Sequence, residues 1–171
     1  MEGNSSKERR RVMLKPAILY KEYIYEAIRE YRYSEDMLLA GASICSWLPD
    51  ISDEDNGGTL FQYAICNKDE ECIGYLSYTI DWYASCAYNF ILFSFDRGNP
   101  SIGKEVFKKI EELLTKFHRI EWRAVSGNPA IRSYDRFCKK HNGNRHVFKD
   151  SFRDYDGNYR DDIIYEILTD N

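Results

Sequence analysis

The hydrophobic positions change their spacing several times along the chain, and each change marks a predicted element. Short runs rich in β-branched and aromatic residues, bounded by turn residues, are typical of strands. Such runs occupy residues 11–15, 59–66, 72–81, 87–95, 119–125 and 162–168, and a further strand is expected before a turn at 154–158. The run at 87–95 is apolar on both faces, which predicts a central strand.

Helical periodicity marks four other segments. Apolar residues recur at helical spacing after Pro16 and again over residues 102–117. A second, weaker helix is expected over residues 34–47. Asn128 favours the start of a short helix that ends near His141, where an Asn-Gly pair follows.

The predicted order is strand, two helices, three strands, helix, strand, helix and two strands. This order predicts an α/β (mixed α+β) fold, with a mixed, mostly antiparallel sheet of about six to seven strands and about four helices on its faces. No internal repeat or linker interrupts residues 11–171, so we expect one domain there. The polar residues 1–10 are expected to form a flexible tail.

Composition and charge narrow the class of protein. The 171 residues carry a net charge of −4, from 24 basic and 28 acidic side chains, whereas nucleic-acid-binding proteins usually carry a basic surplus. No apolar run approaches the roughly 18 residues of a membrane span, and we see no secretory signal. We therefore expect neither a nucleic acid nor a membrane as partner.

The five cysteines show no Cys-x-x-Cys spacing, which favours free thiols and a cytoplasmic location. No metal site is expected, because the histidines lack thiols at metal-ligand spacing.

The first candidate site is the loop between the strand at 87–95 and the helix after it. Backbone N–H groups and the helix dipole at such a junction form an anion site suited to a pyrophosphate. Gly98 and Gly103 would allow close approach of the backbone, and Lys104 adds a positive charge. An ordinary strand–helix turn remains the alternative, because the loop contains neither a P-loop nor a G-x-G-x-x-G pattern.

The second candidate is Tyr134, in the short helix that follows Asn128. A phenol in a suitable position can donate a proton to a leaving group. Tyr134 shares a helix face with Ile131 and Cys138, however, so a core aromatic residue remains the alternative.

These two segments, in this order and on these elements, resemble motifs A and B of the GNAT superfamily of acyl-CoA-dependent N-acyltransferases. Motif A of the family ends in Q/R-x-x-G-x-G/A before a helix. Here Gly103 takes the last position, and Ser101 replaces the middle glycine. Gly98 stands at the Q/R position, with Arg97 one place early. Ser101 can still offer its backbone N–H, because that bond needs no particular side chain.

Motif B matches more closely. Ala130, Ile131 and Tyr134 correspond to the Ala-Ile-x-x-Tyr helix of the family, in which the tyrosine is the usual general acid. Because the predicted order of elements also matches, the resemblance extends over about residues 11–168.

The resemblance implies an N-acetyltransferase that transfers the acetyl group of acetyl-CoA to a primary amine, of a small molecule or of a protein, by direct attack. It implies central strands splayed at the acyl-CoA site, an oxyanion-binding backbone N–H near residues 93–95, and Tyr134 as the catalytic acid. A homodimer is among the assemblies that it allows. The residues expected to bind the cofactor are Phe93, Ser94, Phe95, Arg97, Gly98, Ser101, Ile102, Gly103, Lys104 and Asn128.

The general base and the acceptor stay open. Glu26, Glu30 and Glu121 are candidates for the base, directly or through water. The acidic run over residues 50–55 would suit a cationic acceptor, and a solvated loop is the alternative interpretation. Two other functions also remain: a GNAT-like module that binds acyl-CoA, or nothing, without turnover, because motif A departs from the family pattern; and an unrelated α/β interaction domain.

Overall fold

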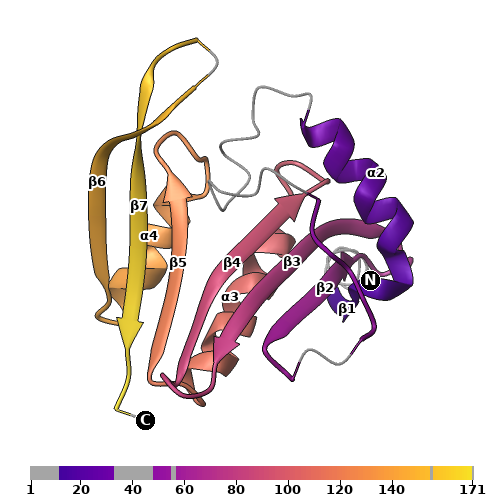
Figure 1. Cartoon of the computed structure of the whole chain (residues 1–171), viewed down its shortest axis with the longest axis horizontal. Coiled ribbons are helices and arrows are strands. Elements are labelled where there is room, and N and C mark those ends of the chain that lie inside the picture. The colour runs from indigo at the N-terminus through magenta and orange to yellow at the C-terminus, as the bar shows by residue number, and fades with distance from the viewer. Residues whose placement is uncertain (1–11, 33–47, 55–56, 155, 171) are drawn as a thin grey trace, which may run out of the picture.

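A computed structural model describes residues 12–32, 48–54, 57–154 and 156–170 (Figure 1). The expected tail at 1–10 and the expected helix at 34–47 lie outside the described residues. Within the described part, the elements follow the predicted order, with strands and helices in the predicted succession.

Seven strands form one sheet, in the order β1-β2-β3-β4-β5-β7-β6. All neighbours pair antiparallel except β4 and β5, which are parallel. The prediction of a mixed, mostly antiparallel sheet is therefore confirmed. The strands are β1 (Met13–Pro16), β2 (Leu60–Cys66), β3 (Cys72–Asp81), β4 (Cys86–Ser94), β5 (Arg119–Val125), β6 (Asn144–Arg153) and β7 (Tyr159–Leu168).

Three α-helices flank the sheet in the described residues: α2 (Lys21–Arg32), preceded by the 3-10 turn η1 (Ala17–Tyr20), then α3 (Pro100–Leu114) and α4 (Ile131–Lys140). None of these described helices is long and apolar enough to span a membrane. In Figure 1, α2 lies in front of the sheet, and α3 and α4 lie behind it. The helices thus cover both faces, as predicted.

The bounds of α3 differ from the predicted 102–117 at both ends. The helix begins two residues earlier, because Asn99 caps it and Pro100 occupies its first turn, where a missing N–H costs nothing. It ends at Leu114, because the N–H groups of Lys116 and Phe117 both turn back to the carbonyl oxygen of Leu113. Phe117 nevertheless stays buried in the core beyond the helix end.

Two hydrophobic clusters fill the two sides of the sheet. Ile24 and Ile28 of α2 pack with Tyr75 and Phe93 on one face. The larger cluster, on the other face, joins α3 and α4 to alternate residues of the strands, among them Leu76, Ile102, Ile110, Trp122, Phe137 and Tyr165. Because successive strand residues point to opposite faces, the strand pattern assigns each side chain to one cluster.

The central strands β4 and β5 diverge soon after they meet. Their pairing consists of Cys86 opposite Arg119 and Ala87 opposite Ile120. Just beyond, β4 contains one extra residue relative to β3, and Asn89 takes a left-handed backbone conformation with φ of 55°. A bulge of this kind bends the strand that contains it. The splayed central strands expected from the resemblance are therefore present (Figure 1).

Candidate active site

Tyr134 lies in an aromatic cluster on the face of the sheet that α3 and α4 cover. It belongs to α4, which begins at Ile131 without a side-chain cap, so the expectation that Asn128 caps this helix is wrong. The side-chain oxygen of Asn128 accepts the N–H of Ala130 at 2.8 Å in the turn before the helix. The Tyr134 ring makes edge-on contacts with the rings of Phe107, Trp122 and Tyr165, with centroid separations of 6.0, 6.2 and 5.8 Å. Edge-to-face packing of this kind holds a ring in one orientation.

The hydroxyl of Tyr134 makes no hydrogen bond with any described residue, although the ring is largely enclosed. Burial away from water disfavours the phenolate, and this raises the pKa of Tyr134 to about 12. At neutral pH the group is therefore protonated, and it has no hydrogen-bond partner among the described residues. Tyr134 is half-buried, and its hydroxyl is not one of the fully buried polar atoms that lack a partner.

Trp122 is the member of this cluster that lies on β5, near the point where β4 and β5 diverge. It stands two residues beyond Ile120, the last residue of β5 that pairs with β4. Its ring stacks on Tyr165 at 5.2 Å and contacts Tyr134 edge-on. Tyr134, the proton donor expected from motif B, thus lies on the face of the sheet that α3 and α4 cover. It is close to the part of β5 that does not pair with β4.

Among residues 93–95, where an oxyanion donor was expected, the backbone N–H groups point to different sides of β4. The N–H of Phe95 donates to Ile73 of β3 at 2.9 Å, so it faces away from β5. Because N–H direction alternates along a strand, Phe93 faces β3 as well, and Ser94 faces the side of β5. No pairing with β5 is present at Ser94 in the described chain.

The loop before α3 differs from the expectation for Ser101. The N–H of Ser101 donates to the side-chain oxygen of Asn99 at 2.9 Å, and that of Ile102 donates to the Asn99 carbonyl at 3.3 Å. The Ser101 N–H is therefore engaged by Asn99 in this structure, and its role as a phosphate donor stays a prediction. Sequence reasoning missed the cap because Asn99 was considered only as part of the loop, although Asn-Pro-Ser is a typical helix start.

An acidic side chain also lies beside this helix start. The carboxamide of Asn99 donates to Asp96 at 2.8 Å, so Asp96 holds the capping residue in place. The two glycines are open by contrast: Gly98 has a φ of 79°, and a Cβ added at Gly98 or Gly103 would meet no atom within 4 Å. The backbone of this loop can be approached closely, but its N-terminal donors are already engaged.

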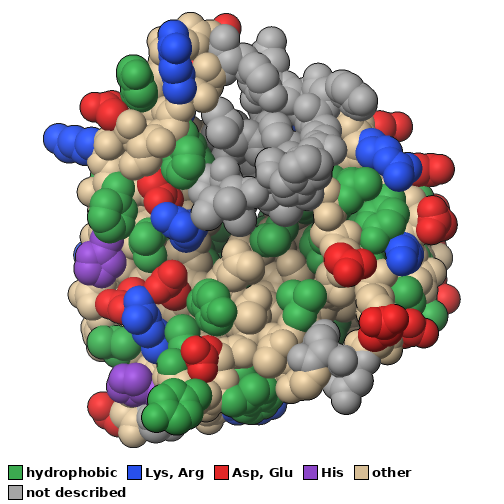
Figure 2. Space-filling model, viewed as in Figure 1, with side chains coloured by type: hydrophobic (Ala, Val, Ile, Leu, Met, Phe, Trp, Pro, Cys, Tyr) green, Lys and Arg blue, Asp and Glu red, His purple; other side chains and the backbone are tan. Residues whose placement is uncertain are grey.

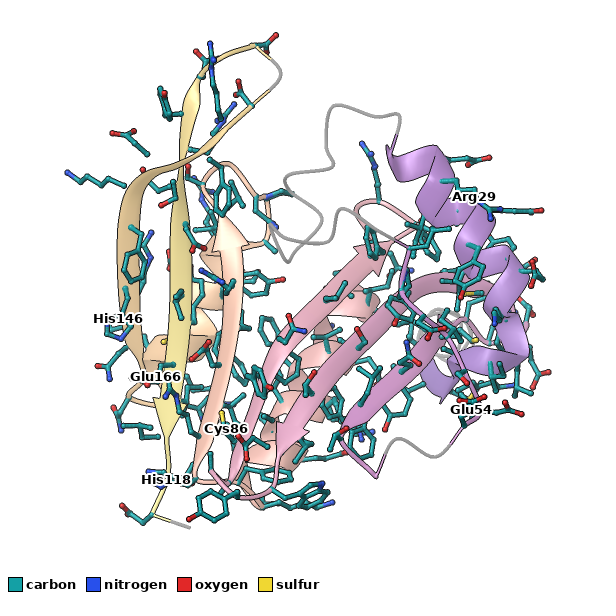
Figure 3. All side chains as sticks on the ribbon, viewed as in Figure 1. Arg29, Glu54, Cys86, His118, His146 and Glu166 are labelled. Carbon is teal, nitrogen blue, oxygen red and sulfur yellow. The ribbon has the colours of Figure 1, made fainter. Side chains whose placement is uncertain are left out.

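The three carboxylates considered as a general base differ in exposure and in ion pairing. Glu26 and Glu30 are exposed on α2. Glu121 is held by Arg119, whose Nη2 lies 2.6 Å from its carboxylate. In the acidic run, the described side chains of Asp50, Asp53 and Glu54 are exposed, and Figure 3 places Glu54 on the β2 side, away from the divergence of β4 and β5. The interpretation of this run as an acceptor site gains no support from Glu54.

Charged side chains also gather on the front of β5, β7 and β6, which α2 leaves uncovered (Figure 2). Arg119 lies between Glu121 and Glu166, and His146 lies 3.6 Å from Glu166 (Figure 3). These contacts lie toward the end of the sheet where β4 and β5 pair. In the described ranges no three His, Cys, Asp or Glu side chains are grouped to hold a metal ion.

A buried charge that the sequence did not reveal lies on the same face. Asp162 of β7 is only 4% exposed, and both of its oxygens accept from Arg123 of β5, Oδ1 from Nε at 3.3 Å and Oδ2 from Nη2. One sequence feature pointed toward this pair. The alternation of polar and apolar residues along β5 places Arg123 on the face of the sheet opposite to that of Trp122.

Comparison with known proteins addresses the fold. No protein-family model matches the sequence, and no curated protein sequence matches it. Several solved structures, in contrast, match this chain in fold. A GCN5-related N-acetyltransferase from Kribbella flavida matches with a TM-score of 0.67 at 12% identity, over 92% of this chain and 98% of that chain. A probable acetyltransferase of the GNAT family from Chromobacterium violaceum matches with a TM-score of 0.62 at 18% identity, over 92% and 82%.

The spermidine/spermine N-acetyltransferase SpeG from Vibrio cholerae, solved with manganese ions, matches with a TM-score of 0.54 at 16% identity, over 66% of this chain and 67% of that chain. At these identities the likeness concerns the fold. The mixed α/β architecture, with its seven-stranded and mostly antiparallel sheet, is consistent with it. The chain therefore has the fold of the GNAT superfamily of N-acetyltransferases.

Proposed function

We propose that this chain is an N-acetyltransferase that transfers the acetyl group of acetyl-CoA to a primary amine, with Tyr134 as the general acid. One observation carries the proposal. The half-buried Tyr134 has a hydroxyl that makes no hydrogen bond with a described residue, in an aromatic cluster beside diverging central strands, in a fold shared with N-acetyltransferases. We treat residues 11–171 as one catalytic domain, acting in the cytoplasm, where thiols stay reduced.

The chemistry follows from the groups on the two sides of the divergence. A neutral amine forms a C–N bond with the thioester carbonyl carbon, and the N–H of Ser94 on β4 stabilises the developing oxyanion. As the C–S bond breaks, Tyr134 donates its proton to the departing sulfur. The amine loses a proton to water or to a carboxylate, and solvent then reprotonates the tyrosinate. The products are the amide and coenzyme A.

The pyrophosphate of the donor is assigned to the loop at residues 97–104. Arg97 and Lys104 supply positive charge there, and the open glycines allow the backbone to approach. Binding at the helix start requires that a phosphate oxygen replace the Asn99 carboxamide at the Ser101 N–H. This exchange loses the cap and gains a charge-assisted hydrogen bond, which is the stronger of the two.

For the acceptor we propose a small-molecule amine. The Vibrio cholerae enzyme is named for spermidine and spermine, which are small amines, and it shares the fold. An amino group of a protein is the alternative acceptor, and both would present the same neutral nitrogen to the thioester.

The experiment is thermal melting with and without acetyl-CoA, followed by thiol release across a panel of amines. A donor at 100 times its Kd stabilises the fold by about 2.7 kcal/mol, and we expect Tm to rise by roughly 5–10 °C. Amine-dependent thiol release should then appear with at least one class of amine. An unchanged Tm at millimolar acetyl-CoA would overturn the proposal.

A second function is favoured by one specific observation. The start of α3 is capped by Asn99 and flanked by Asp96, which disfavours a bound phosphate. A chain with this loop would act as a GNAT-like module that binds an acyl-CoA weakly and does not turn it over. A raised Tm without thiol release from any amine would identify this function.

A further inference from the structure

Trp122 contains a buried hydrogen-bond donor that the proposed mechanism does not use. The side chain is 3% exposed, and its indole N–H makes no hydrogen bond in the part of the chain that the structure describes. Buried donors in folded proteins almost always have a partner, so an orphaned one calls for a physical reason. The N–H of Trp82 shows the usual situation, since it donates to the Gly58 carbonyl at 2.9 Å.

Aromatic neighbours hold the Trp122 ring in one orientation. It stacks on Tyr165 with an interplanar angle of 11°, and Phe137 contacts it edge-on at 6.0 Å. Tyr165 is itself anchored, because its hydroxyl donates to Asp135 at 2.7 Å. Asp135 in turn pairs with Arg145 of β6 at 3.2 Å. This chain of contacts sets the plane of the indole in advance of any ligand.

Trp122 and Tyr134 together make the cluster rich in donors and poor in acceptors. The indole N–H of Trp122 is buried without a partner, the Tyr134 hydroxyl makes no hydrogen bond with a described residue, and the two ring centroids lie 6.2 Å apart. The other side chains around them, Phe107 and Phe137, have no polar atoms, and the nearby Asp135 is already engaged. A ligand that satisfies this cluster must bring acceptors, which a thioester with its amide-containing arm does. An ammonium group brings only donors and cannot satisfy the indole N–H, which is a donor itself.

We infer that the indole N–H of Trp122 binds a carbonyl oxygen of the acyl donor, beside the Tyr134 hydroxyl that faces the sulfur, so that the two side chains form a two-donor site for the thioester end of acyl-CoA. The inference rests on the proposed function, because it takes acyl-CoA as the ligand. It adds a binding residue on β5 to the acid on α4.

The test removes the donor and keeps the shape. Trp122 is replaced by β-(3-benzothienyl)alanine, in which sulfur stands in place of the N–H, and acetyl-CoA and coenzyme A are titrated by calorimetry into the folded protein. Loss of one neutral hydrogen bond should weaken acetyl-CoA binding by about threefold to tenfold. Tm without ligand should stay level or rise, because an unsatisfied donor has been removed. Trp82→Phe is the matched control, and its acetyl-CoA affinity should equal that of the wild type.

The two titrations also identify the carbonyl. Weaker binding of acetyl-CoA alone assigns the N–H to the thioester carbonyl, and equal weakening of both ligands assigns it to an amide of the coenzyme arm. Acetyl-CoA binding within about twofold of the wild type, in a folded variant, would overturn the inference and leave Trp122 as a core residue. A wild-type chain that binds neither ligand would overturn the proposed function, and this inference with it.

Discussion

The side-chain oxygen of Asn99 accepts the backbone N–H of Ser101 at 2.9 Å, so Asn99 caps α3 at the helix start where we propose that the pyrophosphate binds. Asp96 holds the carboxamide of Asn99 from the other side at 2.8 Å. The cap stabilises α3 and competes with an anion for the same donor. If coenzyme A binds at this loop as proposed, Asn99 stabilises the fold and weakens coenzyme binding.

Asn99→Ala should separate these two effects. Loss of the cap should lower the free energy of unfolding by about 1 kcal/mol, measured by urea denaturation. The freed Ser101 N–H should strengthen coenzyme A binding, by up to about tenfold, measured by calorimetry. Asn99→Asp is the matched control: it keeps an oxygen for the cap and adds negative charge, so stability should hold while affinity falls. Weaker binding by Asn99→Ala would mean that Asn99 itself contacts the coenzyme.

Gly103→Glu tests the loop as the pyrophosphate site. An added Cβ meets no atom within 4 Å, and a carboxylate in the first turn of a helix is favourable, so the variant should fold. Its bulk and charge should lower coenzyme A affinity by about tenfold or more, equivalent to about 1.4 kcal/mol. Gly103→Gln has the same bulk without the charge and should lose less. Unchanged affinity in folded Gly103→Glu would remove the loop from the site.

Tyr134→Phe should lower kcat by about 10²–10⁴-fold and leave the acetyl-CoA Kd unchanged. Because the hydroxyl has no bond to a described residue, its removal should leave Tm nearly unchanged as well. A core tyrosine with a bonded hydroxyl would behave in the opposite way, losing about 1 kcal/mol of stability with turnover intact. Turnover and melting measured on one preparation distinguish the two, and near-normal turnover would end the assignment of Tyr134 as the acid.

The alkaline stability of the protein should depend on Tyr134. Burial raises its pKa to about 12 in the folded state, against about 10 in the unfolded chain. The folded form holds the proton more tightly, so this contribution to stability is complete below pH 10 and is lost as the pH rises toward 12. Tyr134→Phe should therefore lose less unfolding free energy than the wild type between pH 10 and 12 in urea titrations. Equal losses would show that the ring is solvated.

Most of the fold could be predicted from the sequence, because strand alternation is a local signal. The strands at residues 72–81 and 119–125 were predicted with the bounds that β3 and β5 have. The bulge at Asn89 could not be predicted, since it depends on how β4 meets β3. The same holds for the pairing of Asp162 with Arg123, which are 39 residues apart.

The candidate site could be predicted in part. Tyr134 was identified by the Ala-Ile-x-x-Tyr pattern, but nothing in the sequence shows that its hydroxyl lacks a partner. The orphaned N–H of Trp122 is a property of the packed cluster, so periodicity indicates only that the side chain faces the core. The cap on the Ser101 N–H is a different case, because the local Asn-Pro-Ser signal that predicts it was available in the sequence. That signal matters for ligand binding only because the cap and a phosphate would need the same N–H.

The most direct test of acetyl transfer is the rate of thiol release from acetyl-CoA, measured for the wild-type chain across a panel of small primary amines. We expect saturable release that depends on both the amine and acetyl-CoA, that rises with pH as the amine loses its proton, and that yields the acetylated amine in equal amount. Acetyl-CoA binding with no amine-dependent release at any pH would contradict it, and would make the chain a binding module with the fold of an acetyltransferase.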